Sequence, residues 1–156
     1  MNNWLTAFGT IGEVAATLTG LLFVSLSVKL NTASSEGRQW MLFVAKRSFL
    51  DFLAVLVIGL LFLMPDISLN TIGWGLVWLT VARVVWHVNH WRIYRATSSD
   101  AFRLIEYLAS IAATLLLTAA GVTALMGRPS APQLTYIGAI TLLFGSCQNA
   151  WRLLVR

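Results

Sequence analysis

A carboxylate inside an apolar stretch is the first candidate for chemistry in this chain. Glu13 lies within the run from Trp4 to Leu30, which is long enough to cross a bilayer and is otherwise apolar or hydroxylated. Small and hydroxyl-bearing residues recur around it at three- and four-residue steps, so they share one face of a helix: Thr6, Thr10, Glu13, Thr17 and Gly20. Ionisable side chains at membrane depth turn towards protein or water. Glu13 and Thr17 are therefore candidates for an ion or proton pathway, and the alternative is a protonated Glu13 hydrogen-bonded within a helical bundle.

A second candidate is a face of the segment 71–94 that carries Thr80, Arg83, His87, His90 and Tyr94. Arg83, His87 and His90 could line an ion path or form a pH-sensitive gate, because histidine changes its charge near neutral pH. The alternative is that both histidines lie among tryptophans in the headgroup region. We expect no metal site, since no cysteine or carboxylate near the histidines completes a ligand set.

A third group of polar residues is expected at one depth of the membrane. At ~1.5 Å per residue, Asp51, Arg83, Gln148 and Asn149 fall about 18 to 22 Å from the outer ends of their segments. We expect an ion pair between Asp51 and Arg83, with Arg47 as a second cation and Gln148 or Asn149 completing the hydrogen bonds, because neither charge is tolerable alone in lipid. This polar layer is predicted to be structural and to hold three helices together.

Several function classes are not indicated by the residues. No nucleophile–base pair, phosphate-binding loop or acid pair of recognisable spacing is present, so we expect neither an enzyme nor a cofactor. The single cysteine, Cys147, excludes an intrachain disulfide. The net charge of +5 arises from basic residues beside apolar segments, which is typical of contacts with anionic lipid and does not indicate nucleic acid.

Composition and the breaks between apolar segments predict the helices that position these residues. The chain is 58% hydrophobic and 11% charged, whereas soluble domains are about 25% charged. Five apolar segments, at about 4–30, 40–64, 71–94, 103–126 and 133–155, are each near the ~20 residues that span a bilayer. We expect an all-α polytopic bundle of five transmembrane helices that forms one domain over residues 1–156.

The orientation of that bundle follows from its lysines and arginines. Of the 11 basic residues, only Arg128 falls on one side of the expected membrane, and the others fall on the opposite side. The positive-inside rule then places the N-terminus outside and the C-terminus in the cytoplasm.

Two stretches resemble known families. AATLTGLLFVSLSVKLN (15–31) and NAWRLLV (149–155) resemble an uncharacterised family of small bacterial polytopic inner-membrane proteins. That resemblance implies a bacterial inner membrane and no particular activity. GTIGEVAAT, around Glu13, is similar to the first helix of small multidrug resistance transporters, which implies that Glu13 binds a proton and a cationic drug by turns. The chain departs from that family in its number of apparent spans and in its polar layer.

The expected function is passage of an ion across the bacterial inner membrane by a homo-oligomer in contact with membrane lipids. The small-residue face of the first segment is the expected subunit contact or pore lining. One alternative is a membrane adaptor or stability factor that holds another membrane protein without transport. The other is a proton-coupled exporter of small molecules that uses Glu13.

Overall fold

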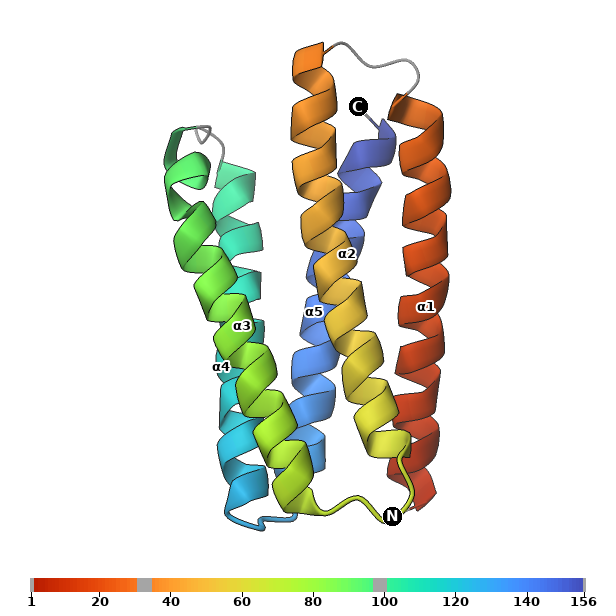
Figure 1. Cartoon of the computed structure of the whole chain (residues 1–156), viewed down its shortest axis with the longest axis vertical. Coiled ribbons are helices and arrows are strands. Elements are labelled where there is room, and N and C mark those ends of the chain that lie inside the picture. Colours follow the sequence, from red (N-terminus) through yellow and green to blue (C-terminus); the bar gives the residue numbers. More distant parts are fainter. Residues whose placement is uncertain (1, 31–34, 97–100, 156) are drawn as a thin grey trace. The chain divides into compact units, whose positions relative to one another are not determined.

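The computed structural model is all-helical over the residues it describes, and its five helices are α1 (Asn2–Leu30), α2 (Ser35–Leu63), α3 (Leu69–Ala96), α4 (Ala101–Leu125) and α5 (Ala131–Val155) (Figure 1). The structure describes the backbone of residues 2–30, 35–96 and 101–155, and the side chains of residues 4–29, 38, 41–42, 44–89 and 108–151. The predicted all-α class and number of helices are confirmed. Helix α2 begins before the apolar segment 40–64, as expected, because its polar first turns are also helical.

Local sequence determines where α3 begins and where α4 ends. The Ser68 hydroxyl oxygen accepts a hydrogen bond from the Thr71 backbone N–H at 3.2 Å, so Ser68 caps the first turn of α3. Gly127 has a φ of 68°, a left-handed conformation that glycine adopts without steric cost. The N–H groups of Gly127 and of the next residue each donate to a carbonyl in the last turn of α4 at 2.9 Å. This is the Schellman arrangement that closes many helices.

The chain forms two compact units, which are described separately. Unit 1 comprises Met1–Leu63 and Leu142–Arg156, and unit 2 comprises Met64–Thr141. Helix α5 therefore contributes its first turns to unit 2 and its remaining turns to unit 1. The expected single transmembrane domain over residues 1–156 stays a prediction.

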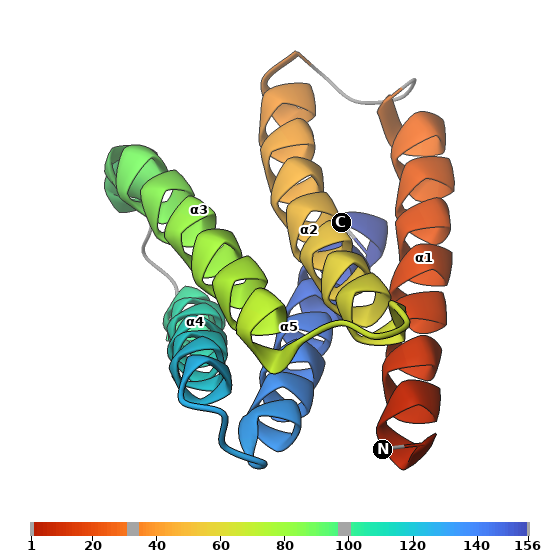
Figure 2. The ribbon, with the colours of Figure 1, turned by 60° about the horizontal axis from the view of Figure 1, so that its bottom comes forward.

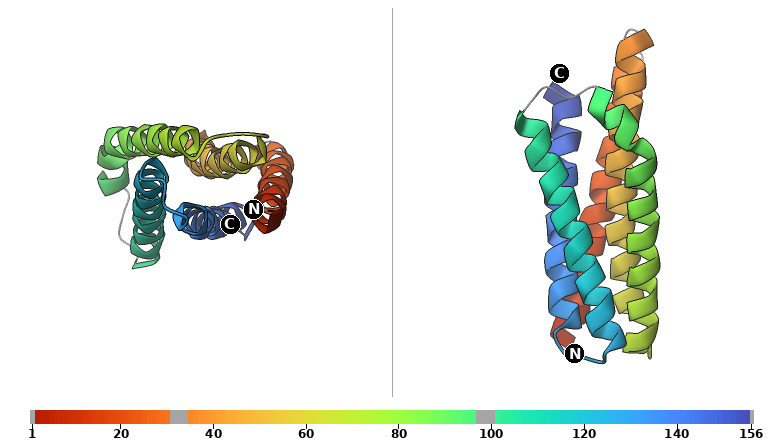
Figure 3. Two further views of the ribbon diagram at one scale, coloured as in Figure 1. Left: turned by 90° about the horizontal axis from the view of Figure 1, so that it is seen from below. Right: turned by 90° about the vertical axis from the view of Figure 1, so that its left-hand side faces the viewer.

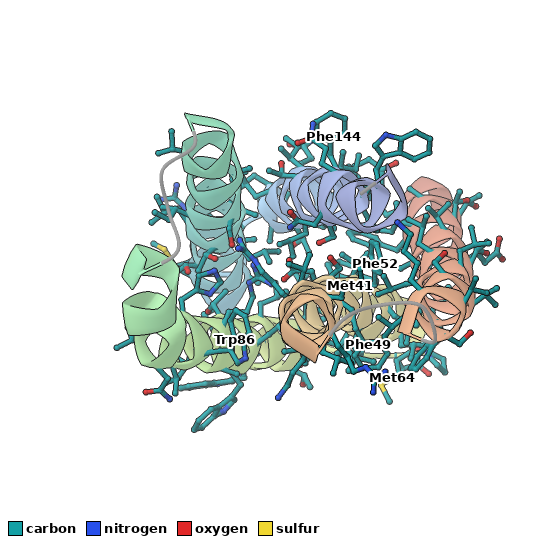
Figure 4. The ribbon with its side chains drawn as sticks, turned by 90° about the horizontal axis from the view of Figure 1, so that it is seen from above. Met41, Phe49, Phe52, Met64, Trp86 and Phe144 are labelled. Carbon is teal, nitrogen blue, oxygen red and sulfur yellow. The ribbon has the colours of Figure 1, made fainter. Side chains whose placement is uncertain are left out.

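In unit 1, α1 and α2 run antiparallel, side by side (Figures 1 and 2). Their backbones nearly touch at two glycines: a Cβ added to Gly59 would lie 3.0 Å from the Phe8 carbonyl oxygen and 3.3 Å from the Gly12 Cα. Phe8 also stacks on Phe62, with ring centroids 3.8 Å apart. Figure 4 shows Phe52, which is fully buried, on the inner side of α2. Glycines and aromatic rings thus build the α1–α2 contact.

In unit 2, α3 and α4 form a second antiparallel pair, seen in the right-hand view of Figure 3. A Cβ added to Gly73 would lie 2.8 Å from Cγ of Leu125, and one added to Gly121 would lie 3.2 Å from Cγ2 of Val77. Small residues therefore allow close approach here as well. Such seams are characteristic of helix pairs in lipid, where apolar burial alone gives little driving force.

The outer surfaces of the helices are strongly apolar. Exposed fractions are 58% for Phe23 on α1, 68% for Trp78 on α3, 64% for Leu115 on α4 and 65% for Phe144 on α5. Among the described residues, three segments are long and apolar enough to cross a membrane: Trp4–Lys29, Leu69–Asn89 and Leu108–Leu125. These observations support a membrane protein with transmembrane helices. Helices α2 and α5 carry more polar residues, including Lys46, Arg47, Asp51, Gln148 and Asn149.

We predict that Gly59→Val destabilises unit 1, because the larger side chain would collide with the backbone of α1. Overpacking of this kind costs about 1–3 kcal/mol. Gly145→Val is the matched control, since no atom lies within 4 Å of the added Cβ there and the change in helix propensity is the same. Thermal unfolding of the purified chain in detergent measures both. Equal unfolding temperatures for the two variants would contradict the α1–α2 packing.

Candidate functional site

The Glu13 face of α1, defined by Thr6, Thr10, Glu13, Thr17 and Gly20, is exposed along its whole length. The packed face of the same helix contains Phe8, Ile11, Ala15 and Leu22, which are all buried. At about 100° per residue, Glu13 lies roughly half a turn around the helix from that packed face. The predicted stripe is therefore the side of α1 that points away from the rest of unit 1.

The chemistry of the Glu13 face is that of an acceptor surface. The hydroxyl of Thr10 donates to the Thr6 carbonyl at 3.0 Å, and that of Thr17 donates to the Glu13 carbonyl at 2.9 Å. Their protons are thus engaged, while the hydroxyl oxygens can still accept. The Glu13 carboxyl makes no hydrogen bond or ion pair with any described residue. Glu13 is therefore not held inside the described bundle, and its oxygens could meet a proton, a cation or a donor from outside the chain.

Unit 1 contains a buried polar contact between α2 and α5. The Ser146 hydroxyl donates to Oδ2 of Asp51 at 2.9 Å, and both residues are buried. A hydrogen bond to a charged acceptor contributes about 1.5–3 kcal/mol. The contact therefore fixes α5 against α2 at the depth where the sequence predicts a polar layer.

Other members of the predicted polar layer are divided between the units. Arg47 and Asn149 are buried in unit 1, but Gln148 is exposed, because α5 turns Ser146 and Asn149 inward on one face. Gln148 thus lies outside the buried part of the layer. Arg83 is buried in unit 2 whereas Asp51 belongs to unit 1, so the ion pair between them stays a prediction.

Ser48 is a polar residue of unit 1 that the sequence does not single out. Its side chain is fully buried, and its hydroxyl has no hydrogen-bond partner among the described residues. Most other described helix hydroxyls donate to a carbonyl three or four residues earlier, as in Thr19, Ser25 and Thr135. Ser48 makes no such hydrogen bond among the described residues. It lies one turn before Asp51, the residue that accepts from Ser146.

Unit 2 contains a cluster made by Arg83, His87 and Ser110. Nε2 of His87 lies 2.9 Å from the Ser110 hydroxyl oxygen, and Nη2 of Arg83 donates to the same oxygen at 3.3 Å. Nδ1 of His87 lies 2.9 Å from the Arg83 backbone carbonyl oxygen. Arg83 and Ser110 are buried and His87 is half-buried. Two of the three predicted residues on this face therefore belong to the contact between α3 and α4.

His90 lies in α3, but its side chain falls outside the described residues. Within the described part of the chain, no three His, Cys, Asp or Glu side chains are close enough together to hold a metal ion.

Sequence reasoning misses Ser48 and Ser146, and it does not pair Ser110 with His87. Serine is common on helix-packing faces, where its hydroxyl usually bonds to its own helix. Only the tertiary structure shows that Ser146 reaches Asp51 and that Ser110 reaches His87. Ser146 lies three residues before Asn149, so a helix places both side chains on one face. That spacing is the one sequence signal that could have indicated the contact between Ser146 and Asp51.

We predict that Ser146→Ala lowers the stability of the chain by about 1.5–3 kcal/mol, because it removes the donor to a buried carboxylate. Ser27→Ala serves as its control, since Ser27 is exposed and donates only to its own helix at Val24. Chemical or thermal unfolding in detergent measures the difference. If both variants unfold at the same temperature, the Asp51–Ser146 contact does not stabilise unit 1.

Comparisons with protein-family models, with curated proteins and with solved structures give no match to this chain. The resemblances of 15–31, 149–155 and the stretch around Glu13 accordingly stay expectations, and any function has to be argued from the residues and their geometry.

Proposed function

We propose that this chain is a multi-pass protein of the bacterial inner membrane that passes a proton or small cation through an assembly of identical copies. In this proposal all five helices cross the membrane, with the N-terminus outside and the C-terminus in the cytoplasm. The observation that carries the proposal is the exposure of Glu13 on a helix that is long and apolar enough to span. The depth of Glu13, the surface that covers it and the chemistry of its neighbours connect that observation to a function.

The first step concerns depth. Glu13 lies nine residues after Trp4 and 16 before Lys29, the ends of the apolar segment of α1, or about 14 Å and 24 Å along the helix. The hydrocarbon core is about 30 Å thick. Glu13 is therefore well inside it, where a charged side chain at the helix centre costs about 2.5–3.5 kcal/mol on insertion scales.

The second step concerns what covers Glu13. The described chain leaves the carboxyl exposed and without a hydrogen bond. A surface made of one carboxyl, two threonines and a glycine is a poor lipid contact, but it suits another helix or a water-filled path. Copies of α1 arranged around an axis would supply both a neighbouring helix and a water-filled path, and the Glu13 carboxyls would face that path.

The third step concerns the transported species. A carboxylate flanked by the hydroxyl oxygens of Thr10 and Thr17 offers acceptors and no described cation, so it favours protons and small cations over anions. We assign Arg83 and His87 to the α3–α4 contact and not to the path, because both are engaged with Ser110. Thr17 lies one turn from Glu13 and is the second candidate for the lining.

A second candidate function is supported by the same face. No atom lies within 4 Å of a Cβ added to Gly20, so another membrane protein could lay a small-residue helix along α1. In that case the chain is an adaptor or stability factor, and Glu13 binds a donor on the partner. The exporter alternative requires, in addition, that a cationic small molecule competes with protons at Glu13.

We predict that purified chain in liposomes carries a proton or cation flux that Glu13→Gln reduces to the level of protein-free vesicles. The substitution keeps the shape of the side chain and removes its charge. Asp66→Asn is the matched control, since Asp66 is an exposed carboxylate in the α2–α3 connection, outside the apolar segments. Its flux should equal that of the unmodified chain. A pH-sensitive dye and a cation-sensitive dye inside the vesicles measure the flux.

The outcomes separate the three functions. Equal flux in Glu13→Gln and in the unmodified chain would overturn the role of Glu13. No flux together with stable co-purification of another membrane protein would support the adaptor. A proton flux that a lipophilic cation inhibits competitively would support the exporter.

A further inference from the structure

The contact between His87 and Ser110 is the best-defined polar interaction between α3 and α4 in unit 2. Two side chains of α3 converge on the Ser110 hydroxyl oxygen. Nη2 of Arg83 lies 3.3 Å from the oxygen and Nε2 of His87 lies 2.9 Å from it. The other ring nitrogen, Nδ1, lies 2.9 Å from the Arg83 carbonyl oxygen. These three distances determine where the protons must be.

The positions of the protons follow from donor and acceptor chemistry. A carbonyl oxygen only accepts, so Nδ1 of His87 carries a proton and donates to it. In a neutral ring Nε2 is then the acceptor, and the Ser110 hydroxyl donates to it. The guanidinium of Arg83 only donates, so the Ser110 oxygen accepts from it. Both ring nitrogens of His87 and the Ser110 hydroxyl are satisfied when His87 is neutral.

Protonation of His87 breaks this arrangement. Both ring nitrogens would then be donors, and the Ser110 hydroxyl could no longer give its proton to Nε2. Its oxygen would have to accept from His87 and Arg83 together, with two positive side chains converging on it. A buried polar network that loses one acceptor is destabilised as a whole. The hydrogen bond from Ser110 to His87 therefore forms with the neutral ring and is lost when the ring gains a proton.

The sequence places several charged and titratable groups near His87 on the two helices of this contact. On α3, Arg83 lies one turn before it and His90 lies three residues after it. On α4, Arg103, Glu106 and Tyr107 precede Ser110, and residues 108–125 contain no titratable side chain. The side chains of His90, Arg103, Glu106 and Tyr107 fall outside the described residues.

A route for protons is provided by the position of His87 along α3. The apolar segment of that helix begins at Leu69, and His87 follows it by 18 residues, or about 27 Å along the helix, which is close to the ~30 Å thickness of the hydrocarbon core. The side chain is half-buried. It is therefore next to the membrane–water boundary, where protons from the aqueous phase can reach the ring.

We propose that His87 is a proton-binding site of unit 2, and that its protonation releases Ser110 and loosens the contact between α3 and α4. Histidine is suited to this role because its charge changes between about pH 5 and 8. The site is separate from Glu13, which belongs to unit 1, and the proposal does not depend on the transport of an ion.

The first test reads the proton positions in the unmodified chain. The chain contains only two histidines, so ¹⁵N-labelled histidine gives two sets of ring signals by NMR in detergent micelles or bilayers. Their assignment comes from His90→Gln or from His87→Gln, whichever variant folds. At pH 8 the His87 ring should be neutral, with the proton on Nδ1. A proton on Nε2 instead, or a charged ring at pH 8, would overturn the proposal.

The second test reads the consequence for the helices. Amide hydrogen exchange, corrected for the intrinsic effect of pH, should rise in α3 and α4 between pH 8 and pH 5 by roughly tenfold, as expected for the loss of one hydrogen bond. In Ser110→Ala the exchange should already be fast at pH 8 and should change little with pH. Thr118→Val is the control on the same helix, because its exposed hydroxyl donates only to the Thr114 carbonyl.

The control should keep the pH dependence of the unmodified chain. If exchange in α3 and α4 of the unmodified chain does not change between pH 8 and pH 5, protonation of His87 does not control the contact and the proposal is wrong. If Ser110→Ala keeps the full pH dependence, Ser110 is not the group that His87 releases, which also contradicts it.

Discussion

Hydrogen bonding in an apolar environment is the constraint on which this structure depends. A polar group in lipid cannot turn to water, so it must bond within its own helix or to another part of the protein. Most of the described helix hydroxyls follow the first route and donate to a carbonyl one turn earlier, as Thr114 and Thr141 do. Ser146 and Ser110 follow the second route and connect neighbouring helices. Glu13 follows neither route within the described chain, which is why its face is the centre of the functional proposal.

Close packing of small residues is the second interaction that holds neighbouring helices together. Lipid tails are as apolar as leucine side chains, so burying leucine between helices yields little net free energy. Glycines instead let backbones approach, as at Gly12 and Gly59 in unit 1 and at Gly73 and Gly121 in unit 2. The polar contacts join α5 to α2 in unit 1 and α3 to α4 in unit 2. Exposed aromatic and aliphatic side chains on the remaining surfaces, such as Trp78 and Phe144, suit contact with acyl chains.

Helix number and type could be predicted from the sequence because apolar segment length and turn residues are local signals. The Glu13 face could also be predicted, since residues at three- and four-residue steps must lie together on any helix. Which side of α1 packs on α2 could not, because it depends on where Gly59 and Phe62 of another helix lie. Gly12 lies against Gly59 of the same chain, and that leaves the Glu13 face outward.

The polar contacts were harder to predict for the same reason. Asp51 and His87 are recognisable as unusual residues at membrane depth, but their hydrogen-bond partners are serines 95 and 23 positions away in the sequence. Spacing within one helix carries no information about such pairs. Gln148 is exposed and Asn149 is buried, although the two residues are adjacent in the sequence.

The central claim is that the Glu13 face of α1 lies against protein or water and not against lipid. Cysteine accessibility in native membranes tests it most directly, with the native thiol removed by Cys147→Ser. Thr17→Cys places a thiol on the Glu13 face, and Val14→Cys places one on a neighbouring exposed side of the same helix. The account predicts that the Thr17→Cys variant reacts with a small water-soluble thiol reagent or forms a disulfide with a second copy, while the Val14→Cys variant does neither. Equal inertness of both variants would show that Glu13 faces acyl chains and would contradict the account.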